Sequence, residues 1–206
     1  MIAIIDYNSG NLTSVKRALD HLKIPNCITS DPKNVRNAER IIFPGVGHAS
    51  TAMEVLRKTK LDVALKDALS QGTPILGICL GTQIILSHSQ EGNTSCLGLI
   101  EGECVHFKLK NPDLKIPHMG WNSITTTRHH PVLEGFSQGV EFYFVHSYYP
   151  APVNHTLIIG VCEYEIEFPA IIGQNNLIAT QFHPEKSGRT GLRLLQNFSQ
   201  WNGKDA

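Results

Sequence analysis

The stretch PILGICLGTQ, residues 74–83, decides the fold class because its pattern changes at a single residue. The apolar run at residues 74–78 is typical of a buried strand, and residues 80–87 have the pattern of a following helix. Cys79 lies at the junction, between Gly77 and Gly81. Glycines let a strand and a helix approach without Cβ clashes. The pattern Gly-x-Cys-x-Gly therefore matches the sharp turn that presents a nucleophile between a strand and a helix.

Cys79 has two interpretations at this point. Free cysteine is among the most often buried residue types, so a core position is one alternative. The other is a nucleophile, because the free N–H groups and partial positive charge at the beginning of a helix favour a thiolate. The same N–H groups can stabilise an oxyanion. The turn alone leaves both alternatives open.

The surrounding chain indicates an α/β fold. Residues 2–5 and 40–43 are predicted strands, and helical spacing covers residues 12–22, 52–56 and 61–69. Continuous apolar strands that alternate with helices predict a mostly parallel sheet with helices on both faces. Strand-like runs with few helical signals predict an antiparallel extension, and an amphipathic helix closes the chain. The runs are 140–145, 157–161, 170–172 and 177–182, and the helix is 191–198.

Composition excludes several functional classes. The chain has 206 residues, a length that favours a single domain, 1–206, and its 18 basic and 18 acidic residues cancel. A zero net charge argues against nucleic acid as the main partner. Five cysteines without a CxxC pair predict neither a zinc site nor a disulfide framework. No signal peptide and no membrane span are recognisable, so we expect a cytoplasmic protein without a bound metal.

A distant block supplies a possible base for Cys79. In QFHPE, residues 181–185, His183 and Glu185 lie two positions apart and would project to the same side of an extended chain. Glu185 could then orient the imidazole while its other nitrogen faces a thiol. A polar turn after a strand is the alternative. The glycines of PGVG, residues 44–47, would let backbone N–H groups approach a ligand, or they simply form a tight turn.

Together, GICLGTQ at 77–83 and QFHPE at 181–185 resemble the class I glutamine amidotransferase family, whose triad is Cys-His-Glu. The segments PGVGH at 44–48, KIPHMGWN at 115–122 and YFVHSY at 143–148 are similar to one branch of that family. Its members are glutaminase subunits that supply ammonia to a (β/α)8-barrel cyclase in histidine biosynthesis. The resemblance implies a flavodoxin-like three-layer sandwich, L-glutamine as substrate, a heterodimer with the cyclase, and no cofactor.

The resemblance also implies residue roles. Cys79 would attack the glutamine amide, His183 would transfer protons, and Glu185 would orient His183. The remaining implied roles are glutamine contacts at Gly47, Leu80, Gln83, Ser147 and Tyr148; oxyanion donors at Val46, Gly47 and Leu80; and a partner-facing, gated side at Trp121, Tyr143, His146 and Lys186.

Several alternatives remain beside this interpretation. The same chemistry could feed another ammonia acceptor, as in surface-sugar biosynthesis, or the chain could be a catalytically silent scaffold. A cysteine hydrolase or protease on this fold often carries histidine directly after the nucleophile, where this chain has Leu80. Trp121 and Tyr143 could be core aromatics. Thr82 stands where relatives often have Met, and we expect the fold to tolerate it.

Overall fold

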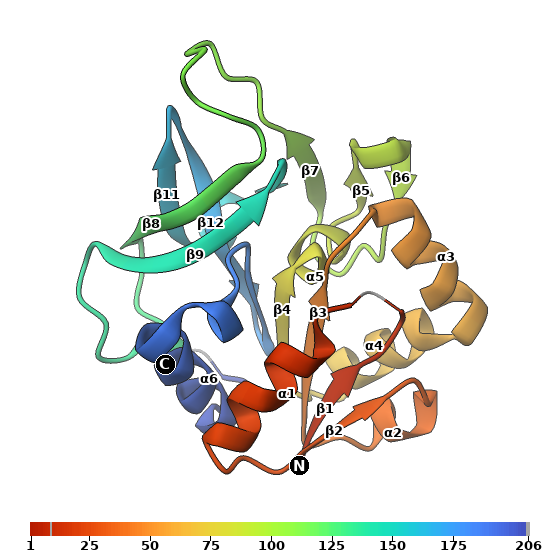
Figure 1. Cartoon of the computed structure of the whole chain (residues 1–206). Coiled ribbons are helices and arrows are strands. Elements are labelled where there is room, and N and C mark those ends of the chain that lie inside the picture. The colour runs from red at the N-terminus through yellow and green to blue at the C-terminus, as the bar shows by residue number, and fades with distance from the viewer. Residues whose placement is uncertain (9, 205–206) are drawn as a thin grey trace.

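A mixed sheet of nine strands forms the centre of the computed structural model, which describes residues 1–8 and 10–204 (Figure 1). Its strand order is β2-β1-β3-β4-β13-β12-β11-β8-β9. The pairs from β2 to β13 are parallel and those from β13 to β9 are antiparallel. The strands are β1 Ile2–Ile5, β2 Asn26–Thr29, β3 Arg40–Gly45, β4 Ile75–Cys79, β8 His118–Thr126, β9 Val140–His146, β11 Ile158–Tyr164, β12 Ile166–Gln174 and β13 Leu177–Thr180.

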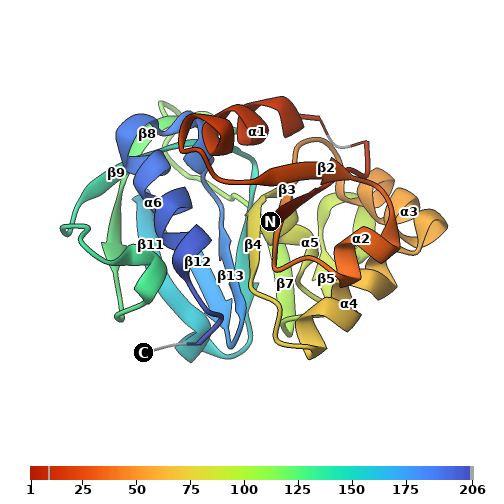
Figure 2. The same cartoon turned by 90° about the horizontal axis from the view of Figure 1, so that it is seen from below.

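Helices cover both faces of the parallel half, because its strands are apolar on both sides. In β3, Ile41 and Phe43 pack into one hydrophobic cluster and Ile42 into the other. Helices α1 and α6 lie on the Ile42 side, and α2, α3 and α4 lie on the opposite side (Figure 2). The three-layer prediction is therefore confirmed. The helices are α1 Leu12–His21, α2 Pro32–Arg36, α3 Ala49–Thr59, α4 Leu61–Ser70, α5 Leu80–Ile84 and α6 Gly188–Gln200.

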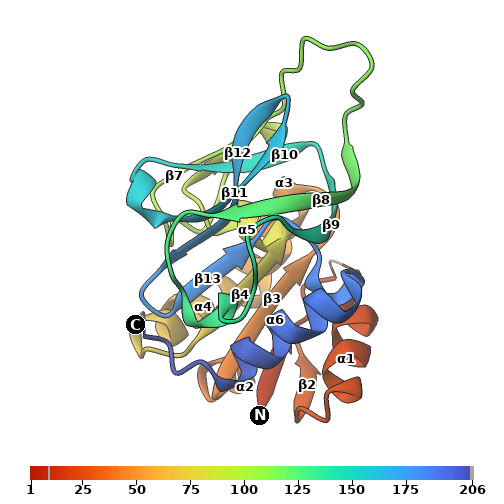
Figure 3. The same ribbon diagram turned by 90° about the vertical axis from the view of Figure 1, so that its left-hand side faces the viewer.

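A second, small sheet lies beside the carboxyl end of β4, in the order β10-β7-β5-β6 (Figures 1 and 3). The segment between β7 and β8 projects away from the rest of the molecule. The small strands are β5 His88–Ser89, β6 Thr94–Ser95, β7 Gly102–His106 and β10 Tyr148–Pro152; the 3-10 turns are η1 Glu91–Asn93, η2 Pro131–Leu133, η3 His155–Leu157 and η4 Pro184–Lys186.

Two predicted elements end earlier than expected. The helix after Cys79 ends at Ile84, because the carbonyls of Ile84 and Ile85 accept hydrogen bonds from the loop at residues 97–100. Strand β13 ends at Thr180, two residues before the predicted end at 182. Beyond this end, the N–H of His183 donates to the carbonyl of Tyr143 on β9, at 2.9 Å. The chain has therefore left the hydrogen-bond ladders that β13 forms with β12 and β4.

Two negative findings apply to the described residues. None of their helices has both the length and the apolar character needed to span a bilayer. Their His, Cys, Asp and Glu side chains form no group of three or more that could hold a metal ion.

Candidate active site

Cys79 lies on the sharp turn between β4 and α5, as the glycine spacing predicts. Its backbone has φ 53° and ψ −105°, a combination that typically costs about 1–3 kcal/mol and is found mainly at functional sites. Gly81 permits the turn, because a Cβ there would lie 1.9 Å from the carbonyl oxygen of Phe43. Gly77 is similarly close to β13, with its Cβ position 2.9 Å from that of Ala179. Cys79 therefore sits at a helix N-terminus on a closely packed turn.

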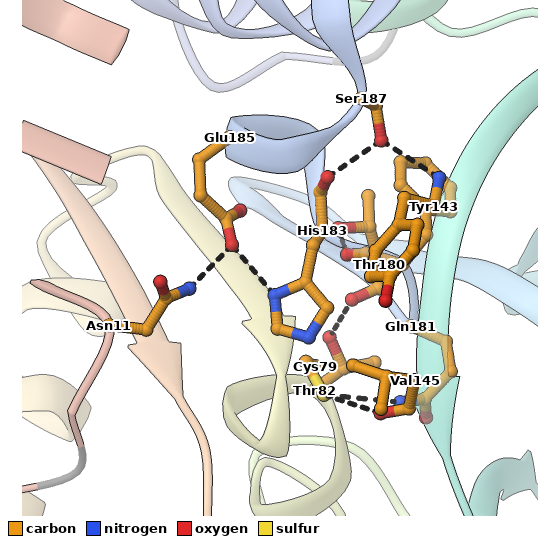
Figure 4. A network of polar contacts seen from close by, with 11 residues as sticks. Asn11, Cys79, Thr82, Tyr143, Val145, Thr180, Gln181, His183, Glu185 and Ser187 are labelled. Carbon is orange, nitrogen blue, oxygen red and sulfur yellow. Dashed lines mark hydrogen bonds and ion pairs between the residues drawn. The ribbon is translucent and has the colours of Figure 1, made fainter. Parts of the chain in front are cut away.

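His183 is fully buried beside Cys79, and Nε2 of its ring faces the sulfur (Figure 4). Its Nδ1 is 2.7 Å from Oε1 of Glu185, which also accepts a hydrogen bond from the side-chain amide of Asn11. The predicted contact between His183 and Glu185 is thus present, but the predicted extended geometry is wrong. The two side chains meet across the 3-10 turn Pro184–Lys186, which a proline at its first position favours.

The surroundings of His183 favour its charged form. Burial by itself lowers the pKa of the imidazole, but the neighbouring Cys79 sulfur and Glu185 carboxylate outweigh burial and raise this pKa to about 10. A protonated imidazole stabilises an anionic sulfur beside it. The side-chain amide of Gln181 also donates to the Cys79 sulfur, at 3.8 Å. The site therefore holds a cysteine next to a charged proton donor.

A cavity of about 340 Å³ opens beside Cys79. Its walls include all five residues expected to contact glutamine and all three residues expected to stabilise an oxyanion. Its lining consists of Val46, Gly47, Cys79, Leu80, Gln83, Glu91, Pro117, Val145, His146, Ser147 and Tyr148.

Three polar residues at the site were not predicted. Glu91 lines the cavity and accepts a hydrogen bond from the N–H of Ala49, at 2.6 Å. Asn11 reaches Glu185 from 174 positions away, and Gln181 contacts Cys79 from 102 positions away. Gln181 stands in the quoted QFHPE block, which was a signal that could have been used. Asn11 follows Gly10 in a segment that also fits the resemblance, but without an assigned role, and Glu91 carries no comparable signal.

The side expected to face a partner carries exposed aromatic and cationic residues. Trp121 is 53 % exposed, which contradicts the core alternative, and its ring contacts that of the half-buried Tyr143. Lys186 is exposed close by in η4. His146 differs, because it shares the inward face of β9 with Phe144 and is buried. It lines the cavity beside Cys79.

Two buried histidines, His118 and His146, carry no charge near neutral pH. Burial lowers the pKa of His118 to about 4 and that of His146 to about 3. Their rings lie 2.9 Å apart, from Nδ1 of His118 to Nε2 of His146. The unfolded chain binds protons at these histidines below pH 6.5, whereas the folded chain does not until about pH 4. Acid should therefore favour unfolding across that window.

This difference in proton binding between the folded and the unfolded chain predicts how stability depends on pH. We expect the wild-type free energy of unfolding to fall between pH 6.5 and 4 more steeply than that of a His118→Phe/His146→Phe double variant. One excluded proton is worth about 1.4 kcal/mol per pH unit. Because the unfolded histidines are only half protonated at pH 6.5 and folded His118 begins to bind a proton near pH 4, we expect a slope difference of about 1.5–2 kcal/mol per pH unit. Urea unfolding at several pH values measures it; equal slopes for both proteins would contradict the assignment.

A doubly covered α/β sheet with a cysteine on the strand–helix turn and a Glu-held histidine beside it defines a class of enzyme. Residues 3–201 match the family model for glutamine amidotransferase class-I. The chain belongs to this family and is a glutamine amidotransferase.

Its relatives indicate a particular branch. The chain is 53 % identical over 203 residues to the imidazole glycerol phosphate synthase subunit HisH of Nitratidesulfovibrio vulgaris strain Miyazaki F, with 96 % of this chain and 95 % of the relative covered. It is 44 % identical over 199 residues to HisH of Dehalococcoides mccartyi strain 195, with 96 % of each covered.

Solved structures agree at the level of the fold. A crystal structure of a glutamine amidotransferase superposes with a TM-score of 0.76 at 16 % identity, covering 98 % of this chain and all of the other. PurLQS from Thermotoga maritima also gives 0.76, at 18 % identity, with 97 % of each chain covered.

Proposed function

We propose that this chain is the glutaminase subunit of a cytoplasmic imidazole glycerol phosphate synthase and hydrolyses L-glutamine through Cys79, His183 and Glu185. The observation that carries the proposal is the His183 ring, which faces the Cys79 sulfur while Glu185 holds its other nitrogen at 2.7 Å. This arrangement is that of an activated nucleophile, its acid–base partner and an orienting carboxylate. The HisH relatives supply the particular pathway.

The geometry supports the following reaction. The Cys79 sulfur attacks the side-chain amide carbon of glutamine, and the carbonyl becomes an oxyanion. The backbone N–H of Leu80, at the beginning of α5, and those at Val46 and Gly47 are the proposed oxyanion donors. His183 then gives its Nε2 proton to the departing nitrogen, which leaves as ammonia while a glutamyl thioester remains. A water loses a proton to His183 and attacks the thioester, which releases glutamate and restores the cysteine.

The shape of the cavity suggests how glutamine is held. The side-chain amide of the bound glutamine must reach Cys79, so the α-amino and α-carboxyl groups of the substrate lie farther out in the cavity. Glu91 supplies an anion there for the α-ammonium group, because its carboxylate lines the cavity and is fixed by the N–H of Ala49. Gln83 and the Ser147-Tyr148 segment supply amide and backbone groups for the rest of the substrate.

Glu91 gives a test of this binding mode. We expect Glu91→Gln to raise the KM for glutamine about 10- to 100-fold, because a charge-assisted hydrogen bond is worth about 1.5–3 kcal/mol. Glutamine at this position keeps an acceptor for Ala49, so the fold should survive. The matched control is Glu103→Gln, which removes a carboxylate that pairs with His88 outside the cavity. Equal KM values for both variants would show that Glu91 does not bind the substrate.

We infer that the ammonia passes to a (β/α)8-barrel cyclase subunit, which forms imidazole glycerol phosphate and aminoimidazole carboxamide ribotide. The proposed docking surface includes Trp121 and Lys186, both exposed, with Tyr143 beside them. Exposed aromatic residues such as Trp121 are enriched at protein interfaces. A silent scaffold is disfavoured by the ordered arrangement of Cys79, His183 and Glu185.

An isotope experiment tests the pathway. The chain is mixed with the cyclase and its ribonucleotide, amide-¹⁵N-labelled glutamine is supplied, and unlabelled ammonium is added in excess. We expect the imidazole product to keep the ¹⁵N label, because transferred ammonia does not mix with the solution. Loss of the label in proportion to added ammonium would refute the transfer, and absence of a complex with the cyclase would refute the assignment to this synthase.

A further inference from the structure

A continuous series of hydrogen bonds joins Asn122, on the inward face of β8, to the glutamine cavity. It begins at Asn122, whose Oδ1 accepts from the N–H of Ser123 at 2.8 Å. The amide nitrogen of Asn122 is therefore the donor on its other side, to the carbonyl of Glu163 at 2.9 Å and to Nε2 of His118 at 3.2 Å. The orientation of Asn122 is fixed by two backbone groups.

The orientation of Asn122 determines which ring nitrogen carries the proton in His118 and in His146. Because Nε2 of His118 accepts, the neutral ring carries its proton on Nδ1, which donates to Nε2 of His146 at 2.9 Å. The neutral ring of His146 then carries its own proton on Nδ1. That group donates to the carbonyl of Tyr148 at 2.7 Å. Both histidines must therefore be neutral Nδ1–H tautomers, and both ring donors point toward the cavity.

The last acceptor belongs to the proposed glutamine site. The Tyr148 carbonyl also accepts from the side-chain amide of Gln83, at 3.1 Å. Both residues line the cavity, and Gln83 donates as well to Gln181, whose amide contacts the Cys79 sulfur. A shift of the Tyr148 carbonyl would therefore move or free the Gln83 amide. The His146 bond holds this carbonyl from behind.

Packing alone does not require these histidines. The His118 ring stacks on Tyr164 and lies against Phe144 and Phe168, an environment that a phenylalanine ring would also suit. Burying a polar ring is unfavourable unless its nitrogens are bonded, and here all four are. Fully satisfied buried networks fix one geometry. The pair therefore serves to set a position.

We propose that Asn122, His118 and His146 act as a positioning relay, which holds the Tyr148 carbonyl and Gln83 in the arrangement that binds glutamine. Asn122 lies on the face of β8 opposite Trp121, so a partner docked at Trp121 would bias the relay through the backbone of this strand, and hence the affinity for glutamine. This inference rests on the proposed glutaminase function, and it assigns roles to His118 and Asn122 that the chemistry itself does not need.

The tautomers provide a test that is independent of activity. Two-bond ¹⁵N–¹H correlation spectra of the imidazole-labelled full chain at pH 7 should show Nδ1 protonated and Nε2 unprotonated in both His118 and His146, assigned through His118→Phe and His146→Phe. An Nε2–H tautomer, or an imidazolium ring, at either position would overturn the relay, whether or not the chain hydrolyses glutamine.

Substitutions test the positioning role in the complex with the cyclase and its ribonucleotide. The loss of a buried hydrogen bond weakens binding by about tenfold. We therefore expect His146→Phe to raise the KM for glutamine about tenfold or more, with less than a threefold change in kcat. His146→Asn, whose amide can replace the Nδ1–H donor, should recover most of the affinity. His130→Phe is the matched control, because His130 is equally buried but lies in the η2 region away from the cavity.

A double variant distinguishes a relay from two separate packing residues. If the histidines act in series, His118→Phe/His146→Phe has the same KM as His146→Phe alone; if each acts separately, the two increases multiply. Multiplied effects, or a KM for His146→Phe equal to that of His130→Phe, would overturn the proposal. A wild-type complex that hydrolyses no glutamine would instead refute the proposed function, and the tautomer spectra would still decide the geometry.

Discussion

Replacing Cys79 with alanine is expected to reduce glutamine hydrolysis by about 10⁴-fold or more, because the atom that forms the thioester is absent. The expected loss exceeds that for the binding residues, since no other group in the cavity can take over bond formation. The assay is glutamate release in the presence of the cyclase and its ribonucleotide. Synthesis driven by added ammonia should continue at the wild-type rate, because the proposed cyclase chemistry lies on the other chain.

The control for this variant is Cys27→Ala. Cys27 is a half-buried cysteine on β2, at the edge of the sheet remote from β4 in strand order. Its removal should leave glutamate release within about twofold of wild type. Glutamate release by Cys79→Ala at more than a few per cent of the wild-type rate would exclude the covalent mechanism. Loss of ammonia-dependent synthesis as well would indicate a broken complex rather than a missing nucleophile.

Gly81→Ala is expected to destabilise the fold by about 3 kcal/mol, although alanine usually favours a helix over glycine by about 1 kcal/mol. The steric clash outweighs the gain in helix propensity, because the new Cβ would lie 1.9 Å from the backbone oxygen of Phe43, which cannot rotate away. Strand β3 and helix α5 must then separate, and the Cys79 turn with them. For a chain of this size we expect a melting temperature lower by about 6–12 °C.

The comparison variant is Gly98→Ala. Gly98 has φ +65° but no atom within 4 Å of a Cβ position, so only backbone strain of about 1–2 kcal/mol applies. Urea unfolding of both variants separates the clash from that strain. If Gly81→Ala proved no less stable than Gly98→Ala, the close approach of α5 to β3 would be incorrect.

The arrangement of Cys79, His183 and Glu185 could be predicted because it depends on short segments of sequence. The glycines around Cys79 are needed for a local close approach, and His183 and Glu185 are neighbours in the chain. Strands β1, β3 and β4 and the helices α1, α3 and α4 were likewise recognisable, since these strands are largely apolar; β2 and α2 were not predicted. These features depend on residues that are close together in the sequence, and hydrophobic periodicity detects patterns of this kind.

The rest depends on contacts between distant segments. Strands β2, β5, β6, β7, β8 and β10 were not predicted, because they are short or, in the case of β8, carry histidine, glycine, tryptophan and asparagine in place of an apolar run. Glu91 carries no motif, and only the approach of η1 to the beginning of α3 brings it into the cavity. His146 was expected on the partner side, but the strand period of two turns it inward with Phe144.

The most direct test of the account is the covalent state of Cys79. The chain, with its cyclase and ribonucleotide present, is treated with a glutamine analogue that carries an electrophile in place of the amide, and the modified peptide is identified by mass spectrometry. We predict one adduct per chain, on Cys79, whose formation is suppressed by glutamine and abolished by His183→Phe. An unmodified Cys79, or an adduct on Cys96 or Cys104 that inactivates the enzyme, would contradict the account.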